Sequence, residues 1–348
     1  MPTEVVKTIG SQPDDDYSTL AAWYADRKGN LVQRDTIEVA ELRGEDHDVG
    51  DGFTMGSSGV TVDADHYFVI RAMAGAEFKG NAGNLNGVAR VKLEWVEYHG
   101  AYLAVIGCYV PYTRFERFVV WGDAVNNYSG EDLTSLSLAC LNVGYGVDAC
   151  VANGLGVRAH VSIPHAYWSH AFVEGVRNAA LVKNCVVYDI GISTMNFSEA
   201  SCIYECTYCY NNTVANVYGA FDKYGIRFCN TVKNNLVFNI PGYYAHTIID
   251  CTTVDYNATD DGQGLGEHGI QIVGSNEVEN TTPDNFHAKL KSTAQCRDAG
   301  TDLSGTVDTD VYGTSRPQGN AFDIGAWEYE EQQPGVKKIP WHLFFAGM

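Results

Sequence analysis

Three cysteines, Cys202, Cys206 and Cys209, have the C-x3-C-x2-C spacing with which radical S-adenosylmethionine enzymes hold a [4Fe–4S] cluster. Three thiolates at that spacing on one loop can ligate three irons. No helical pattern surrounds the segment, however, and on a strand Cys202 and Cys206 share one face, as packing residues do. A zinc site is no better supported, because no histidine stands at finger spacing. We therefore expect no metal and no cofactor, and interpret the ten cysteines as reduced, buried, small apolar side chains.

Two further groups have metal-binding residue types. His160, His165 and His170 are five residues apart, and imidazole is both a metal ligand and a proton carrier. His165 has the opposite strand parity to the other two, so we interpret the three as separate packing or surface side chains. The segment Asp255–Gly262 is similar to an oxygen-rich calcium loop, but Asp260 occupies the place that requires glycine. A plain acidic loop is the simpler interpretation, and a weak calcium site remains the alternative.

These residues lie in a region that repeats itself. The segment 183–191 (KNCVVYDIG) returns at 233–242 (KNNLVFNIPG), the segment 210–219 (YNNTVANVYG) is a third copy, and 136–144 is a weaker fourth. A unit of about two dozen residues is the period of a solenoid. Aligned on the Asp or Asn before the closing glycine, the copies place Asn142, Asp189, Asn216 and Asn239 in one column, at intervals of 47, 27 and 23 residues.

Apolar residues alternate within each copy, which is the pattern of a half-buried strand. One such strand cannot bury its apolar face alone, whereas coils stacked about 4.8 Å apart form a continuous core. Side chains of the aligned Asn and Asp column can form hydrogen bonds from coil to coil, and a following glycine allows the chain to turn. The sequence therefore predicts an all-β, single-stranded, right-handed parallel β-helix over residues 31–329, with roughly ten or more coils and a structural ladder at Asn142, Asp189, Asn216 and Asn239.

Both ends of the predicted solenoid have their own patterns. Residues 1–30 predict a short strand and a capping helix over residues 18–27, with acidic residues at its start and Leu20, Trp23 and Tyr24 on one side. Such a helix would cover the first coil, whose edge could otherwise pair with another chain. At the other end, Ser315–Tyr329 predicts a final strand.

The composition excludes some classes of partner. The formal net charge is −20, with a pI near 4.7, and no basic stripe is present to neutralise phosphates, so we expect no nucleic acid partner. No apolar stretch reaches the length of a membrane span, and the first residues carry no secretion signal, so we expect no membrane partner.

Several motifs together resemble a known superfamily. They are the opening Tyr17–Trp23, the segment Phe68–Gly80, the coils that end in Asn and Gly, and the ending Arg316–Tyr329 with its R-P-x-G and D-I-G-A-x-E-Y elements. They resemble right-handed parallel β-helix proteins of the pectate-lyase-like superfamily, and more narrowly those of tailed bacteriophages and prophages. The resemblance spans about residues 17–329. It implies the fold but not the activity, because that fold hosts lyases, hydrolases, adhesins and inert virion parts.

The resemblance implies that an enzyme of this fold would act in a groove along one face, with an Arg or Lys base in a lyase or paired carboxylates in a hydrolase. A base and several acids can share a face only in the region of Asp222, Lys223, Arg227, Asp250 and Asp255. These five are the candidate catalytic residues if the protein is an enzyme. An Asp-Lys pair in a glycine-rich turn is also typical of an exposed ion pair that contributes little.

The expected function is that of a non-enzymatic virion protein, a fibre, spike or capsid decoration made in the host cytoplasm, which contacts surface glycans. The alternative is a polysaccharide lyase or glycoside hydrolase. Residues 330–348 form a polar linker and an apolar segment, in which Trp341, Leu343, Phe344 and Phe345 are candidates for docking to other virion proteins or to a second copy of the chain. The same segment could instead be a flap that closes the last coil.

Overall fold

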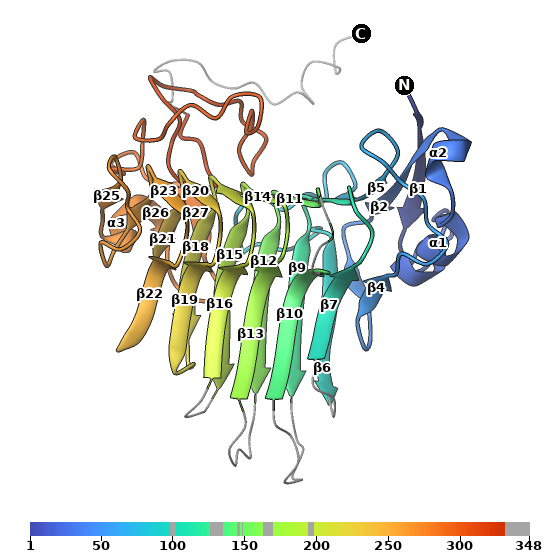
Figure 1. Cartoon of the computed structure of the whole chain (residues 1–348), viewed down its shortest axis with the longest axis horizontal. Coiled ribbons are helices and arrows are strands. Elements are labelled where there is room, and N and C mark those ends of the chain that lie inside the picture. Colours follow the sequence, from blue (N-terminus) through green and yellow to red (C-terminus); the bar gives the residue numbers. More distant parts are fainter. Residues whose placement is uncertain are drawn as a thin grey trace, which may run out of the picture.

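The computed structural model describes residues 1–97, 102–125, 135–144, 147, 149–162, 170–193 and 198–330. The chain winds through three parallel sheets, from the first to the second to the third and back to the first, as Figure 1 shows with the N-terminal end in blue and the C-terminal end in red. Each sheet runs along the length of the molecule. The predicted right-handed parallel β-helix is therefore confirmed.

The strands of each sheet follow one another at regular steps along the chain. Sheet 1 contains β1 (Thr3–Ile9), β2 (Thr36–Leu42), β5 (Phe68–Ala72), β8 (Arg114–Glu116), β11 (Val151–Asn153), β14 (Leu181–Lys183), β17 (Tyr208–Tyr210), β20 (Thr231–Lys233) and β23 (Thr253–Asp255). Sheet 2 contains β3 (Asp46–Asp48), β6 (Arg90–Glu97), β9 (Val119–Val125), β12 (Gly156–Ser162), β15 (Val186–Ser193), β18 (Thr213–Tyr218), β21 (Leu236–Phe238), β24 (Ala258–Thr259) and β25 (Ile270–Gln271). Sheet 3 contains β4 (Phe53–Met55), β7 (Tyr102–Cys108), β10 (Ser135–Val143), β13 (His170–Arg177), β16 (Ser198–Tyr204), β19 (Asp222–Arg227) and β22 (Tyr244–Ile249).

The described strands make seven complete coils, from β2–β3–β4 to β20–β21–β22, so the expectation of ten or more was too high. Part of the length goes instead into a non-repetitive C-terminal region. This region contains α3 (Gly274–Glu277) and the antiparallel pair β26 (Val278–Asn280) and β27 (His287–Leu290).

The N-terminal end is capped as the sequence predicts. Helix α1 (Leu20–Arg27) buries Leu20, Trp23 and Tyr24, and the Trp23 ring lies 5.8 Å from that of Phe68 in β5. Its cap is not acidic, because Thr19 Oγ1 accepts the hydrogen bond from Ala22 N (3.1 Å). A one-turn helix, α2 (Leu31–Arg34), follows. Strand β1 pairs with β2, so the first residues belong to sheet 1 rather than to a separate cap.

The interior is filled by apolar side chains that include most of the cysteines. All ten are free thiols; nine are buried, and Cys251 is partly exposed. Cys206, Cys229 and Cys251 occupy the same place in consecutive coils, each directly after a residue with positive φ at the corner between sheets 3 and 1. Each thiol donates to the carbonyl oxygen two residues earlier, at 3.2–3.3 Å. A small side chain that can satisfy its own weak donor suits this narrow corner.

Three members of the predicted ladder are confirmed, and one is wrong. Asn216 Nδ2 donates to Asp189 Oδ1 (2.9 Å), and Asn239 Nδ2 donates to Asn216 Oδ1 (2.6 Å). All three have φ between 52° and 60°, the left-handed conformation that Asn and Asp tolerate. Asn142 lies instead in β10 of sheet 3, paired with Arg177, because the weak copy at 136–144 is a strand of another sheet.

A second ladder is fully buried where sheet 1 turns into sheet 2. The backbone N–H groups of Cys185, Asn212 and Asn235 donate to the side-chain oxygens of Asn212, Asn235 and Asn257 respectively, at 2.9–3.0 Å. The Asn212 and Asn235 side-chain amides donate to the next oxygen in the column, at 2.9 and 3.0 Å. Because all three asparagines are completely buried, each lost bond would leave a polar group without water.

The last part of the described chain, residues 296–329, lies back along the solenoid, and we call it the C-terminal wrap. It contains no strand, so the predicted final strand at Ser315–Tyr329 is wrong. Backbone carbonyls of the wrap instead accept hydrogen bonds from a row of asparagine side chains, and these asparagines lie at turns with positive φ. These bonds run from Asn184 Nδ2 to Thr309 O (2.7 Å), from Asn211 Nδ2 to Asp323 O (2.8 Å) and from Asn234 Nδ2 to Thr301 O (2.8 Å).

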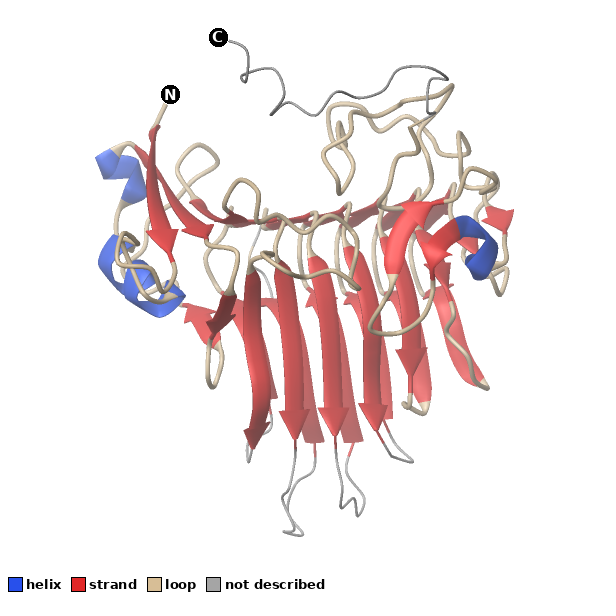
Figure 2. Ribbon diagram, turned by 180° about the vertical axis from the view of Figure 1, so that it is seen from behind, coloured by secondary structure: helices blue, strands red, loops and turns tan. Residues whose placement is uncertain are grey.

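The wrap and the region before it cover part of the outer face of sheet 2. Figure 2, seen from behind, shows loops and short strands lying in front of the upper part of this sheet. Outward side chains of sheet 2 and residues of the covering chain form a second apolar core. Its members include Val186, Tyr188, Ala215 and Phe238 from the sheet and Phe286, Leu290, Cys296, Ile324 and Trp327 from the cover.

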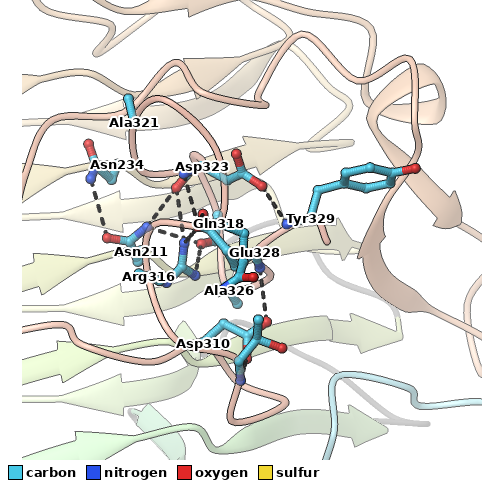
Figure 3. A network of polar contacts seen from close by, with 12 residues as sticks. Asn211, Asn234, Asp310, Arg316, Gln318, Ala321, Asp323, Ala326, Glu328 and Tyr329 are labelled. Carbon is cyan, nitrogen blue, oxygen red and sulfur yellow. Dashed lines mark hydrogen bonds and ion pairs between the residues drawn. The ribbon is translucent and has the colours of Figure 1, made fainter. Parts of the chain in front are cut away.

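A buried ionic network holds the wrap together (Figure 3). Arg316 Nη1 contacts Glu328 Oε2 at 2.8 Å, and both side chains have no exposed surface. Backbone N–H groups of Gln318 and Asp323 donate to Glu328, and that of Glu328 donates to Asp310. Burial, followed by the nearby Glu328 charge, raises the pKa of Asp323 to about 7. The R-P-x-G and D-I-G-A-x-E-Y motifs therefore encode this network.

Candidate functional site

The outer face of β13, β16, β19 and β22 is open, and no described segment crosses in front of it in Figure 1. We call it the front face. The parallel ladder keeps its outward residues in three rows that cross these coils. The rows are Glu199–Asp222–Tyr244, Glu174–Ser201–Tyr224–His246 and Arg177–Tyr204–Arg227–Ile249.

Alternation along each strand separates these rows from the core. Val173, Ala200 and Ile226 point inward and are buried, while the charged and aromatic residues between them point outward. A sheet that faces solvent on one side normally carries scattered polar residues there. The front face instead carries two arginines, several carboxylates and a run of aromatic rings.

Arg177 organises the first half of the face. Its guanidinium contacts Glu174 Oε1 and Glu205 Oε2, both at 3.1 Å, and lies over the Tyr204 ring at 5.1 Å. The ring and the two carboxylates fix the guanidinium in one position.

Arg227 occupies the equivalent place two coils later. It contacts Glu199 at 3.1 Å and Asp250 at 3.4 Å, and its guanidinium lies 4.0 Å from the Tyr224 ring centre and 4.3 Å from that of Phe228. The face thus presents two similar cation–aromatic–carboxylate units.

Glu174 is the most strongly perturbed acid on the face. It is only 4% exposed, and burial raises its pKa to about 7, while Arg177 opposes the shift. The neighbouring charges of Glu199 and Glu205 add to the rise. Glu174 can therefore hold or release a proton near neutral pH, which is the property of a general acid or base.

Exposed aromatic rings gather at the C-terminal end of the face. Phe221, Tyr243 and Tyr244 are 46%, 90% and 45% exposed. The Tyr244 ring centre lies 4.9 Å from that of Phe221 and 4.8 Å from that of Tyr243. Phe228, 42% exposed, continues the strip towards Tyr204 at 5.7 Å. Rings grouped in this way on a polar face are typical of a ligand-contact surface.

The five candidate catalytic residues do not form one cluster. Asp222, Arg227 and Asp250 belong to the front face. Lys223 points to the opposite side of the sheet; it is 7% exposed, and its Nζ donates to Ala220 O at 2.6 Å. Asp255 lies in β23 of sheet 1 and pairs with His268 at 3.0 Å. Neighbouring residues of a strand point to opposite faces, so Asp222 and Lys223 could not share one.

Two acids of the face, Glu174 and Glu199, were not among the candidates predicted from the sequence; they lie on the adjacent strands β13 and β16. The signal was present, because each is an isolated acid in an otherwise small or apolar strand, HAFVEGVR and SEASCIY. Outside a known motif, this pattern does not distinguish a functional acid from a solvated one.

Most of the other candidate ligands are placed apart, although the Cys206 and Cys209 thiols contact each other. His160 lies on sheet 2, in register with Asp123, and stacks on Tyr218 at 6.0 Å; His165 and the side chain of His170 lie outside the described residues. Cys202 points into the coil from sheet 3, whereas Cys209 lies in sheet 1. Asp261, in the acidic loop, accepts bonds from Thr247. Within the described ranges, no group of three or more His, Cys, Asp or Glu could hold a metal ion.

Comparison with protein families, with curated proteins and with solved structures finds no match for this chain. No helix among the described residues is long and apolar enough to cross a membrane. The candidate docking residues Trp341, Leu343, Phe344 and Phe345 lie outside the described residues.

Proposed function

We propose that this protein is a non-catalytic adhesion component of a virion, a fibre, spike or capsid decoration, and that its front face contacts surface glycans. The observation that carries the glycan contact is the strip of exposed aromatic rings on the open sheet. Apolar faces of sugar rings pack on aromatic rings, while hydroxyl groups bond to fixed carboxylates and guanidinium groups. The virion assignment depends on the resemblance to phage β-helix proteins.

The geometry of the solenoid supports an extended ligand. Equivalent positions recur about every 4.8 Å along the axis, which is close to the length of one pyranose unit in a chain. The two arginine units lie two coils apart, and the exposed rings lie in the coil of Arg227 and in the next coil. A polysaccharide lying along the axis would therefore meet a new set of contacts at each coil.

The test compares two variants of the full chain. Tyr243→Ala with Tyr244→Ala removes the most exposed rings, and Tyr208→Ala removes a ring that is equally exposed to that of Tyr244 (45%) but lies in sheet 1. Binding to a glycan panel should fall at least about tenfold, or 1.4 kcal/mol, in the first variant and stay unchanged in the second. If the unmodified chain bound no glycan of the panel, the proposal would be refuted.

The virion assignment has its own test. Purified phage particles of the strain that carries this sequence should contain the chain in stoichiometric amount by mass spectrometry. Its absence from particles would leave only the glycan contact.

A glycoside hydrolase is the second candidate, because Glu174 has a proton available near neutral pH and Glu199 lies on the adjacent strand of the same face. Two carboxyl groups on one face are the minimum set for hydrolysis of a glycosidic bond. A rise in reducing ends that Glu174→Gln abolishes would favour this candidate. Unchanged glycan after long incubation would favour adhesion.

A further inference from the structure

The front face carries more negative than positive charge. Its described acids are Glu174, Glu199, Glu205, Asp222 and Asp250, against the two guanidinium groups of Arg177 and Arg227, so four carboxylates remain against two cations even when Glu174 is protonated. Each arginine is already bound to two carboxylates. The whole chain has the same sign, with a formal charge of −20. A polyuronate would therefore meet repulsion along the face, whereas a cationic chain would meet attraction.

One carboxylate stands apart from the arginine units. Among the described residues, Asp222 makes no ion pair and no side-chain hydrogen bond, and the next strand places Tyr244 directly opposite it. The Tyr244 ring packs on Phe221, and Glu199 lies opposite Asp222 on the other neighbouring strand. A free carboxylate next to exposed aromatic faces is the arrangement that binds an ammonium group, because charge attraction and the ring quadrupole act together.

We propose that the front face selects polysaccharides with free amino groups, and that one amine binds between Asp222, Glu199 and the Phe221–Tyr244 rings. The ligand class is a polymer of deacetylated amino sugars. N-acetylation would remove the positive charge and leave Asp222 without a partner. The inference rests on the proposed function, since it specifies which glycan the face contacts.

The test measures binding of the full chain to three oligosaccharides of equal length. They are a fully deacetylated glucosamine oligomer, its N-acetylated form and an oligogalacturonate, at mildly acidic pH and at low and physiological ionic strength. The deacetylated oligomer should bind at least about tenfold more tightly than the acetylated one. Salt should reduce the difference without abolishing it, because the site combines charge with ring contact.

Two variants separate a site from general attraction to an acidic protein. Asp222→Asn keeps the size of the side chain and should remove most of the preference for the free amine. Asp65→Asn removes the same formal charge from an exposed position between β4 and β5, and should leave the preference unchanged. Equal loss in both variants would overturn the inference.

The other outcomes of the binding test distinguish the amine selection from the glycan-contact proposal. Equal or tighter binding of the acetylated oligomer, or tightest binding of the oligogalacturonate, would overturn the amine selection while the glycan-contact proposal stands. If the chain bound none of the three oligosaccharides and no other glycan in the panel, both the amine selection and the glycan-contact proposal would be overturned.

Discussion

Arg316 in the C-terminal wrap offers the sharpest test of how the molecule is held together. Its guanidinium contacts Glu328 at 2.8 Å with no exposed surface on either side chain, and it also donates to Asp323 O and Gly325 O. Arg316→Met keeps much of the volume and removes the charge. Three carboxylates, those of Asp310, Asp323 and Glu328, then remain without their cation.

Breaking a buried ion pair from one side costs about 3–5 kcal/mol, because the remaining charge has neither partner nor water. The loss should appear first as local opening of the wrap, since sheets 1 and 3 do not depend on it. Hydrogen exchange of peptides from residues 298–329 should accelerate by roughly two to nearly four orders of magnitude, up to the limit set by global unfolding. The Gly325 amide, which donates to Asn234 O, is a direct reporter.

Lys7→Met is the matched control. Lys7 pairs with Asp16 at the same distance of 2.8 Å, but the two side chains are 32% and 35% exposed. An exposed pair contributes about 0–1 kcal/mol, so exchange near β1 should change less than about fivefold. If Arg316→Met changed exchange in the wrap as little as this control changes it near β1, the buried network would not be what holds the wrap.

Three further predictions concern single positions. Burial raises the pKa of Asp323 to about 7, above the unfolded value of about 3.9, so its contribution to stability is full below about pH 4 and is lost progressively as pH rises to about 7. Proteolysis of the wrap should become faster over this range and level off above about pH 7, and Asp323→Asn should flatten this dependence. Gly219→Ala should lower stability by at least about 2 kcal/mol in thermal unfolding, because φ is +75° and the new Cβ would collide with Ile192 O. Gly59→Ala, at φ +73° with no atom within 4 Å of the new Cβ, measures the cost of the backbone conformation alone. Equal losses of stability in the two variants would contradict the collision. Asn235→Leu should cost about 2–4 kcal/mol in urea unfolding, because ladder groups on both neighbouring coils lose their partners; an unchanged midpoint would show that the ladder is not stabilising.

The repeat explains why the fold was predictable. The strong copies 183–191, 210–219 and 233–242 occupy equivalent places in three successive coils, and the intervals of 27 and 23 residues correspond to real coils. The interval of 47 does not, because Asn142 was aligned across two different sheets. A weak repeat gives the spacing of strands but not which sheet they belong to.

The sequence repeat does not predict the path of the wrap or the side chains of the front face. Residues 296–329 adopt their path through carbonyl bonds to Asn184, Asn211 and Asn234, which no local pattern indicates. The direction of Lys223 follows from strand parity, but only once the start of β19 at Asp222 is known. Glu174 required knowledge of its burial, which depends on neighbouring coils.

The wrap has a consequence for synthesis. It joins residues that the ribosome makes far apart in time, such as Asn184 and Thr309, 125 positions later. Nascent coils can stack as they emerge, since each contacts only its neighbours. The outer surface around Val186 and Tyr188, however, stays uncovered until residues 278–327 have been made. A chain released before these residues are made would therefore expose an apolar surface that favours aggregation, and their synthesis is the step that covers it.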